Sequence, residues 1–226
     1  ARLFLDQARQ AGYKALELGP DGYLPEDREV LKQELSSRGL EAASGTACYR
    51  FDQYERFADF RPAVEKLCGR VSSMGGRYLV TMDESDVGLY SEKKADYTPA
   101  VWKKYFTMFR EMGEFARREF GLMMVYHPHI KSLIETEEEI ACLLDATGLN
   151  LCFDTGHHAY VNGNGQRGDP SVPNFIRRYA ERIKYLHFKQ VDGEVYARVL
   201  REHLDSDTAF DMDVMCDLPD GIIDFK

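Results

Sequence analysis

Short apolar runs alternate with helical patterns along most of this chain, and no other feature constrains its fold so strongly. The segments between the runs have apolar residues at a period near 3.6, as amphipathic helices do. A strand–helix alternation repeated this often predicts a parallel sheet covered by helices. The runs that we interpret as strands are Lys14–Leu18, Leu40–Ser44, Arg77–Met82, Leu122–His127, Leu149–Asp154 and Ile183–Phe188.

The predicted helix ends agree with this alternation. Thr136 precedes three glutamates, a pattern typical of a first helical turn, where carboxylates complement the helix dipole. Glycines stand just before five of the strands, where helices often end in a left-handed residue. These glycines are Gly12, Gly39, Gly76, Gly121 and Gly148.

Two folds fit six such strands. The chain has 226 residues, opens on a helix and closes at GIIDFK, whereas a (β/α)8 barrel typically needs about 250 residues. We therefore expect a (β/α)8 TIM barrel, forming a single domain over residues 1–226, whose first and last strands lie outside the sequence. The alternative is a complete six-stranded doubly wound sheet.

Charge and cysteine usage narrow the class of protein. The chain has 38 acidic and 29 basic residues, for a net charge of −9, so it lacks the excess of Lys and Arg that nucleic acid or an anionic membrane surface requires. No apolar run approaches the roughly 18 residues of a membrane span. Five scattered cysteines without a CxxC pair indicate reduced thiols. We expect a cytoplasmic protein, and a homo-oligomer stays open.

Five of the six histidines lie at the carboxyl ends of three successive predicted strands, where parallel α/β folds build their sites. Asp154 ends the apolar run LNLCFD, and a carboxylate in such a place needs a cation or hydrogen-bond donors. Imidazole and carboxylate together suit a divalent transition ion such as Mn²⁺, Co²⁺, Fe²⁺ or Zn²⁺. The five histidines are His127, His129, His157, His158 and His187.

Two further residues are candidates at the same rim. Lys189 projects to the same side as His187 if the strand continues, and its ammonium suits a substrate hydroxyl or a developing oxyanion. Glu17 ends the run KALEL and points toward this rim. Cys152 alternates within its strand, and we interpret it as a small core residue rather than a nucleophile.

Several stretches carry a resemblance to a known family. They are AGYKALELGPDGYLP (Ala11–Pro25), VYHPHIKSLIET (Val125–Thr136), LCFDTGHH (Leu151–His158), RIKYLHFKQVD (Arg182–Asp192) and GIIDF (Gly221–Phe225). Here the sequence resembles the xylose isomerase-like TIM-barrel superfamily of sugar isomerases, epimerases and dehydratases. The YHPH and ELGPDGY stretches are most similar to its myo-inosose-2 dehydratase branch, in inositol catabolism.

The resemblance implies a divalent metal site, with Mn²⁺ or Co²⁺ favoured and Zn²⁺, Fe²⁺ or Mg²⁺ as alternatives. Asp154 and His187 match family ligands, and His127 stands where epimerases carry a first Glu ligand. A final Glu would lie on a strand beyond Lys226. Gln190 replaces the usual Asp of the HxKD motif. The implied ligands are Asp154, His187 and His127, the implied catalytic residues are His127, His157, Glu17 and Lys189, and the implied substrate-binding residues are His129, Lys189 and Glu17.

The function that these residues favour is a metal-dependent dehydratase, a carbon–oxygen lyase. Its substrate would be an inosose or a similar polyhydroxy ketone, dehydrated through a metal-stabilised enediolate. His127, His129, His157 and Glu17 are the candidates for the acid and the base. A ketose 3-epimerase or sugar isomerase would use the same enediolate and return the proton. A non-catalytic sugar-binding relative is the alternative from another class.

Overall fold

The computed structural model describes residues 1–19, 22–88, 91–95 and 97–225. Its chain forms two compact units. The first consists of residues 1–82 and 99–125, and the second of residues 83–98 and 126–226. Among the described residues, no helix has the length and apolar character that a membrane span requires.

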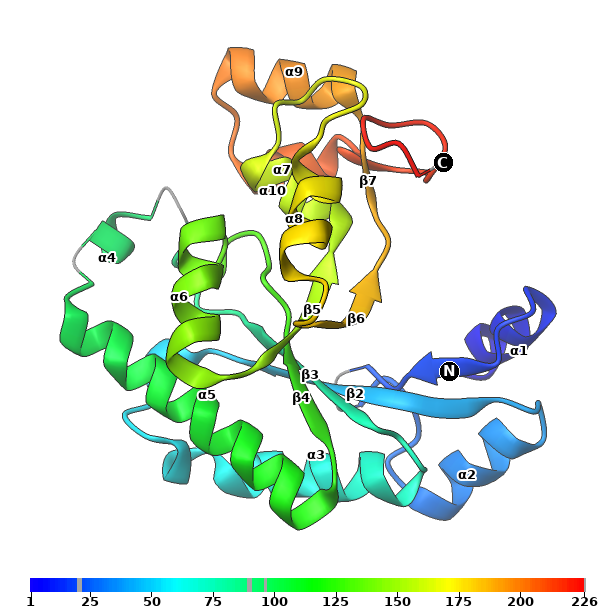
Figure 1. The fold of residues 1–226 in the computed structure, drawn as a ribbon. Helices are drawn as coiled ribbons and strands as arrows, with labels where there is room; N and C mark the ends of the chain where they lie inside the picture. Colours follow the sequence, from blue (N-terminus) through cyan, green and yellow to red (C-terminus); the bar gives the residue numbers. More distant parts are fainter. Residues whose placement is uncertain (20–21, 89–90, 96, 226) are drawn as a thin grey trace. The chain divides into compact units, whose positions relative to one another are not determined.

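The first unit holds four strands, which pair in the order in which they follow along the chain (Figure 1). β1 and β2 are parallel, with Ala15 opposite Glu41. The last residues of β3 and β4, Asp83 and Tyr126, belong to the second unit. The strands are β1 (Ala15–Glu17), β2 (Glu41–Tyr49), β3 (Tyr78–Asp83) and β4 (Met123–Tyr126).

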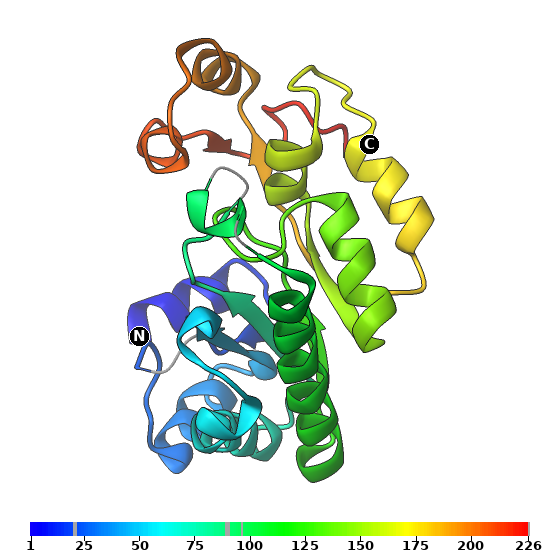
Figure 2. The ribbon, with the colours of Figure 1, turned by 90° about the vertical axis from the view of Figure 1, so that its left-hand side faces the viewer.

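Helices cover these strands. Figure 2 shows the longest, α5, running beside the sheet, and α5 packs on α3. Phe51, from a 3-10 turn, and Phe109, from α5, meet edge to face in the core, with ring centroids 4.9 Å apart. Both side chains are fully buried. The helices are α1 (Arg2–Gln10), α2 (Arg28–Ser36), α3 (Arg61–Ser73) and α5 (Pro99–Phe120), with short 3-10 turns at Phe51–Gln53 and Phe57–Asp59.

In the second unit, β5 (Asn150–Asp154) and β6 (Ile183–His187) pair in parallel, with Asp154 opposite His187. A separate antiparallel pair follows, formed by β7 (Gln190–Val191) and β8 (Met215–Cys216). The helices are α4 (Glu92–Ala95), α6 (Glu137–Thr147), α7 (Thr155–Asn162), α8 (Ser171–Tyr179), α9 (Gly193–Glu202) and α10 (Ser206–Asp211).

The six strands predicted from the sequence are all present, and the (β/α) alternation is confirmed. Thr136 caps α6 through a reciprocal pair of bonds with Glu139, as its pattern predicts. Gly12, Gly39, Gly121 and Gly148 have positive φ angles, whereas Gly76 does not. The neighbouring Gly75 takes the left-handed conformation there, with φ of 82°, so the prediction for Gly76 is wrong by one residue. The pair β7–β8 was not predicted, because two-residue strands carry no periodicity.

Candidate active site

Strands β4, β5 and β6 bring six polar side chains together in the second unit. His127 and His129 follow β4, Asp154 ends β5, His157 begins α7, and His187 and Lys189 lie at and just after the end of β6. His127, Asp154 and His157 are at most 4% exposed. We call these six residues the histidine cluster. The structure thus brings together the three predicted metal ligands and three other predicted site residues, His129, His157 and Lys189.

The turn from β5 into α7 fixes the centre of the histidine cluster. The Oδ1 atom of Asp154 accepts a hydrogen bond from the backbone N–H of His157 at 3.0 Å and caps α7. Thr155 donates its hydroxyl to the carbonyl of Lys189 at 2.7 Å and accepts from the N–H of Lys189 at 2.9 Å. A Cβ on Gly156 would lie 2.5 Å from the Cβ of Lys189. The DTGH motif therefore holds Lys189 against the start of α7.

The capping bond leaves the Oδ2 atom of Asp154 facing the Lys189 ammonium and two histidine rings. The Nζ atom of Lys189 lies 3.1 Å from Oδ2 in an ion pair, although Oδ2 has no partner in hydrogen-bond geometry. A ring nitrogen of His187 lies 3.8 Å from Oδ2, and one of His157 lies 3.9 Å away. The Asp154 carboxylate is thus the negative centre of the histidine cluster.

Hydrogen bonds decide which nitrogens of two rings carry the proton. The Nδ1 atom of His129 lies 2.7 Å from the carbonyl oxygen of Ile130. Because a carbonyl only accepts, Nδ1 donates and Nε2 keeps its lone pair. The Nε2 atom of His157 lies 2.7 Å from Nζ of Lys189, and an ammonium only donates, so a neutral His157 carries its proton on Nδ1. His129 therefore presents a free base to its surroundings, and His157 holds Lys189.

Burial disfavours the charged form of three rings in the histidine cluster. It lowers the pKa of His127 and of His157 well below the usual histidine value, and the Lys189 ammonium acts in the same direction on His157. Burial also lowers the pKa of His129. The rings are packed closely, with centroids 3.9 Å apart for His129 and His157 and 4.8 Å for His127 and His187. Neutral imidazoles serve as metal ligands and as proton acceptors.

The donor atoms fit a divalent ion. One ring nitrogen each of His127, His129 and His157 lies within 4.8 Å of the other two, although that of His157 would first have to give up its contact with Lys189. Nδ1 of His127 and Oδ2 of Asp154 are buried without hydrogen-bond partners, which is the state of a ligand atom whose partner is an ion. Nitrogen and carboxylate donors suit the transition ions expected from the sequence. A second group, missed by sequence reasoning, consists of His127, Cys152 and His187.

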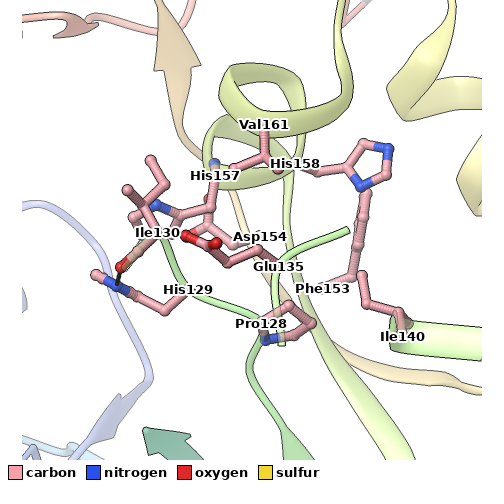
Figure 3. A pocket seen from close by; sticks show the side chains of 10 residues that line it. All are labelled: Pro128, His129, Ile130, Glu135, Ile140, Phe153, Asp154, His157, His158 and Val161. Carbon is pink, nitrogen blue, oxygen red and sulfur yellow. Dashed lines mark hydrogen bonds and ion pairs between the residues drawn. The ribbon is translucent and has the colours of Figure 1, made fainter. Parts of the chain in front are cut away.

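His158 does not join the histidine cluster, although it follows His157 directly. Successive helical residues point about 100° apart, and Figure 3 shows the two side chains leaving α7 in different directions. The ring of His158 packs between Phe153 and Phe175, with centroids 5.0 and 4.6 Å away. Its Nε2 atom lies 3.4 Å from a Glu137 carboxylate oxygen, without hydrogen-bond geometry.

A small pocket separates these two environments, as seen in Figure 3. Polar groups of the histidine cluster line one side, and apolar side chains around His158 line the other. Its lining residues are Pro128, His129, Ile130, Glu135, Ile140, Phe153, Asp154, His157, His158 and Val161.

The loop that carries His129 is anchored by a buried acid that sequence reasoning did not assign. Asp83, at the end of β3, accepts a hydrogen bond from the backbone N–H of Leu133 at 2.8 Å and another from the hydroxyl of Ser85. Asp83 is only 2% exposed. Its anchoring role depends on the hydrogen bond to Leu133, 50 residues further along the chain, and no local sequence pattern predicts such a contact.

Glu17 belongs to the first unit, at the end of β1. Its carboxylate accepts a hydrogen bond from the hydroxyl of Thr46 on β2. Pro20 and Asp21, which follow it in the ELGPDGY stretch, lie outside the described residues. The catalytic and substrate-binding roles expected for Glu17 stay predictions.

Buried neutral histidines predict a loss of stability in acid. Burial lowers the pKa of His158 to about 4, so between the usual value near 6.5 and about 4 the unfolded chain binds a proton that the folded chain does not. The contribution is complete above pH 6.5 and falls as the pH decreases, by about 1.4 kcal/mol per pH unit for each such histidine. We expect urea unfolding to give a free energy of unfolding that falls steeply from pH 7 to pH 5.

In the variant His158→Phe, a phenyl ring takes the place of the imidazole between Phe153 and Phe175. The free energy of unfolding should then depend less on pH, by the contribution of one proton, about 1.4 kcal/mol per pH unit. His203→Asn is the matched control, because His203 is exposed in a left-handed position that ends α9. An unchanged slope in His158→Phe would contradict the assignment of a buried neutral His158.

The chain matches known proteins over nearly its whole length. The family model described as xylose isomerase-like TIM barrel matches residues 5–226. The rhizopine catabolism protein MocC of Rhizobium meliloti is 32% identical over 98% of this chain and 67% of its own length. The inosose dehydratase of Lacticaseibacillus casei is 32% identical over 98% of this chain and 74% of its own length.

Solved structures share the fold. The probable 3-DHS dehydratase AsbF of Bacillus anthracis, described as involved in petrobactin synthesis, has a TM-score of 0.74 at 16% identity, over 98% of this chain and 79% of its own. The IOLI protein with a bound zinc atom has a TM-score of 0.65 at 14% identity, over 84% of this chain and 68% of its own.

Proposed function

We propose a function from the family to which this chain belongs, the xylose isomerase-like TIM barrel family. The proposed function is that of a metal-dependent dehydratase of an inosose or a similar polyhydroxy ketone. The observation that carries the proposal is the buried Asp154 carboxylate, which lies among histidine rings and beside Lys189. The names of the relatives, inosose dehydratase above all, support the substrate class. The proposal includes a cytoplasmic location, where buried thiols such as Cys68 and Cys152 stay reduced.

Asp154, His187 and His127 are the residues that we propose to hold the divalent ion. An ion bound there supplies Lewis-acid polarisation of the substrate ketone, which makes the neighbouring C–H bond more acidic. The Asp154 carboxylate contributes the negative charge, and its capping bond to α7 keeps it oriented. The two imidazoles contribute nitrogen donors, which suit a divalent transition ion.

Proton removal is assigned to His129. Its Nε2 lone pair is available because Nδ1 donates to the carbonyl of Ile130, and burial lowers its pKa, so it is unprotonated near neutrality. In the proposed reaction, Nε2 takes the proton from the carbon next to the ketone. The electron pair of that C–H bond forms a C=C bond to the carbonyl carbon, and the C=O π electrons move to the ketone oxygen, which gives an enolate.

Loss of the hydroxyl is assigned to the pair Lys189 and His157. The Lys189 ammonium lies 2.7 Å from His157 and 3.1 Å from Asp154, so its charge is held at a fixed place beside the acid. It donates a proton to the departing hydroxyl, which leaves as water while the enolate electrons form the C=C bond. The proton taken up by His129 then restores the ammonium, and the balance is one water lost.

The proposal is tested by incubating the protein with 2-keto-myo-inositol. We expect a diketone product that absorbs in the ultraviolet, no product after EDTA treatment, and recovery when Mn²⁺ or Co²⁺ is added. Interconversion of ketohexoses at C3 without loss of water would instead favour the epimerase. Binding of the ketone without turnover would favour a non-catalytic relative.

A further inference from the structure

Strand β5 carries a cysteine, Cys152, two residues before Asp154. Side chains two residues apart on a strand share a face, so Cys152 and Asp154 point the same way, roughly 6.5 Å apart along the strand. Cys152 is fully buried. Its Sγ atom and one ring nitrogen each of His127 and His187 lie within 4.8 Å of one another. We call these three residues the inner group.

Two donor groups in this unit therefore share His127, and the position of Lys189 distinguishes them. The outer group consists of His127, His129 and His157. The Nε2 atom of His157, a member of the outer group, lies 2.7 Å from the Lys189 ammonium, so a dication bound to that nitrogen would meet a like charge at close range. This contact counts against His157 as a ligand, and the inner group is therefore the better donor set.

An unpaired donor atom lies on the residue that both groups share. His127 is 3% exposed, and its Nδ1 atom has no hydrogen-bond partner among the described residues. A buried polar atom without a partner is costly unless an ion or a water completes it.

We propose that Cys152 is a thiolate ligand of the divalent ion and that the site therefore selects Zn²⁺ or Co²⁺ over Mn²⁺ and Mg²⁺. This inference rests on the proposed function, since it adds a ligand to the ion of that site. Sulfur and imidazole donors prefer these softer ions, whereas oxygen donors suit Mg²⁺ and Mn²⁺. Binding converts the thiol to a thiolate, and its proton leaves to solvent as the metal–sulfur bond forms.

The test is a titration of the metal-free protein with Co²⁺, followed by absorbance. A cobalt–thiolate bond gives a sulfur-to-metal charge-transfer band in the near ultraviolet, which nitrogen and oxygen ligands do not give. We expect this band in the wild-type protein and its loss in Cys152→Ser and in Cys152→Ala. Cys68→Ala is the matched control, because Cys68 is equally buried but lies in α3 of the first unit.

Zinc affinity provides the second measurement. Removing a residue that only supports a ligand costs about 10–100-fold in affinity, so loss of the Cys152 thiolate should cost about 100-fold or more for Zn²⁺. The affinity for Mn²⁺ should change much less. The preference for Zn²⁺ over Mn²⁺ should therefore shrink in Cys152→Ser and persist in Cys68→Ala.

The outcomes separate this inference from the proposed function. Binding of one Co²⁺ per chain without a charge-transfer band would overturn the role of Cys152 and leave a metal-dependent dehydratase intact. A charge-transfer band that persists in both Cys152 variants would overturn it too. Failure of the folded protein to bind any of the ions would overturn both.

Discussion

Replacing Asp154 by Asn should remove the bound metal and almost all turnover while leaving the fold in place. The amide oxygen of Asn can still accept the bond from the N–H of His157 that caps α7, so the helix start survives. The negative charge does not survive, and the Lys189 ammonium, now 3.1 Å from a neutral group, would repel a dication. Because losing a supporting residue costs 10–100-fold in metal affinity, we expect losing this ligand to cost about 100-fold or more.

Metal content after dialysis and turnover with the inosose are the two measurements for Asp154→Asn. The matched control is Asp205→Asn, because Asp205 caps α10 through the N–H of Thr208 at 2.8 Å but lies outside the histidine cluster. The control should keep the metal and the activity. Equal metal content in Asp154→Asn and the wild-type protein would exclude Asp154 as a ligand.

Replacing His129 by Gln should abolish proton removal but not metal binding. General-base catalysis contributes about 10²–10⁴-fold, and His129 is the ring whose Nε2 lone pair is left available by the bond from Nδ1 to Ile130. We expect kcat to fall by about 10²-fold or more. Exchange of the substrate C–H hydrogen with deuterated solvent should fall equally, with unchanged metal content.

The pH dependence of kcat/KM is an independent test of proton removal by His129. Burial lowers its pKa, so the acidic limb of the kcat/KM profile should lie below the usual histidine value near 6.5. That limb should disappear in His129→Gln and persist in His203→Asn, a variant of the exposed histidine after α9. Undiminished hydrogen exchange in His129→Gln would assign proton removal to another group.

The sequence alone determined where the strands lie and which of their ends carry histidines. Periodicity and glycine positions are local properties, so they identify β1 to β6 without knowledge of the fold. Because parallel strands align their carboxyl ends, His127, Asp154 and His187 could be expected at one edge before any contact was known. The structure agrees, with Asp154 directly opposite His187.

Tertiary contacts alone decided how these residues are used. Helical geometry points the side chain of His157 toward the histidine cluster and that of His158 toward aromatic rings, although the two residues are adjacent in sequence. Lys189 becomes the partner of Asp154 because Thr155 holds its backbone from 34 residues away. Cys152, which by its pattern is only a small core residue, lies beside two imidazoles. Local patterns fix which face a side chain takes, whereas its partner across the fold depends on how distant segments pack, and no short stretch of sequence encodes that.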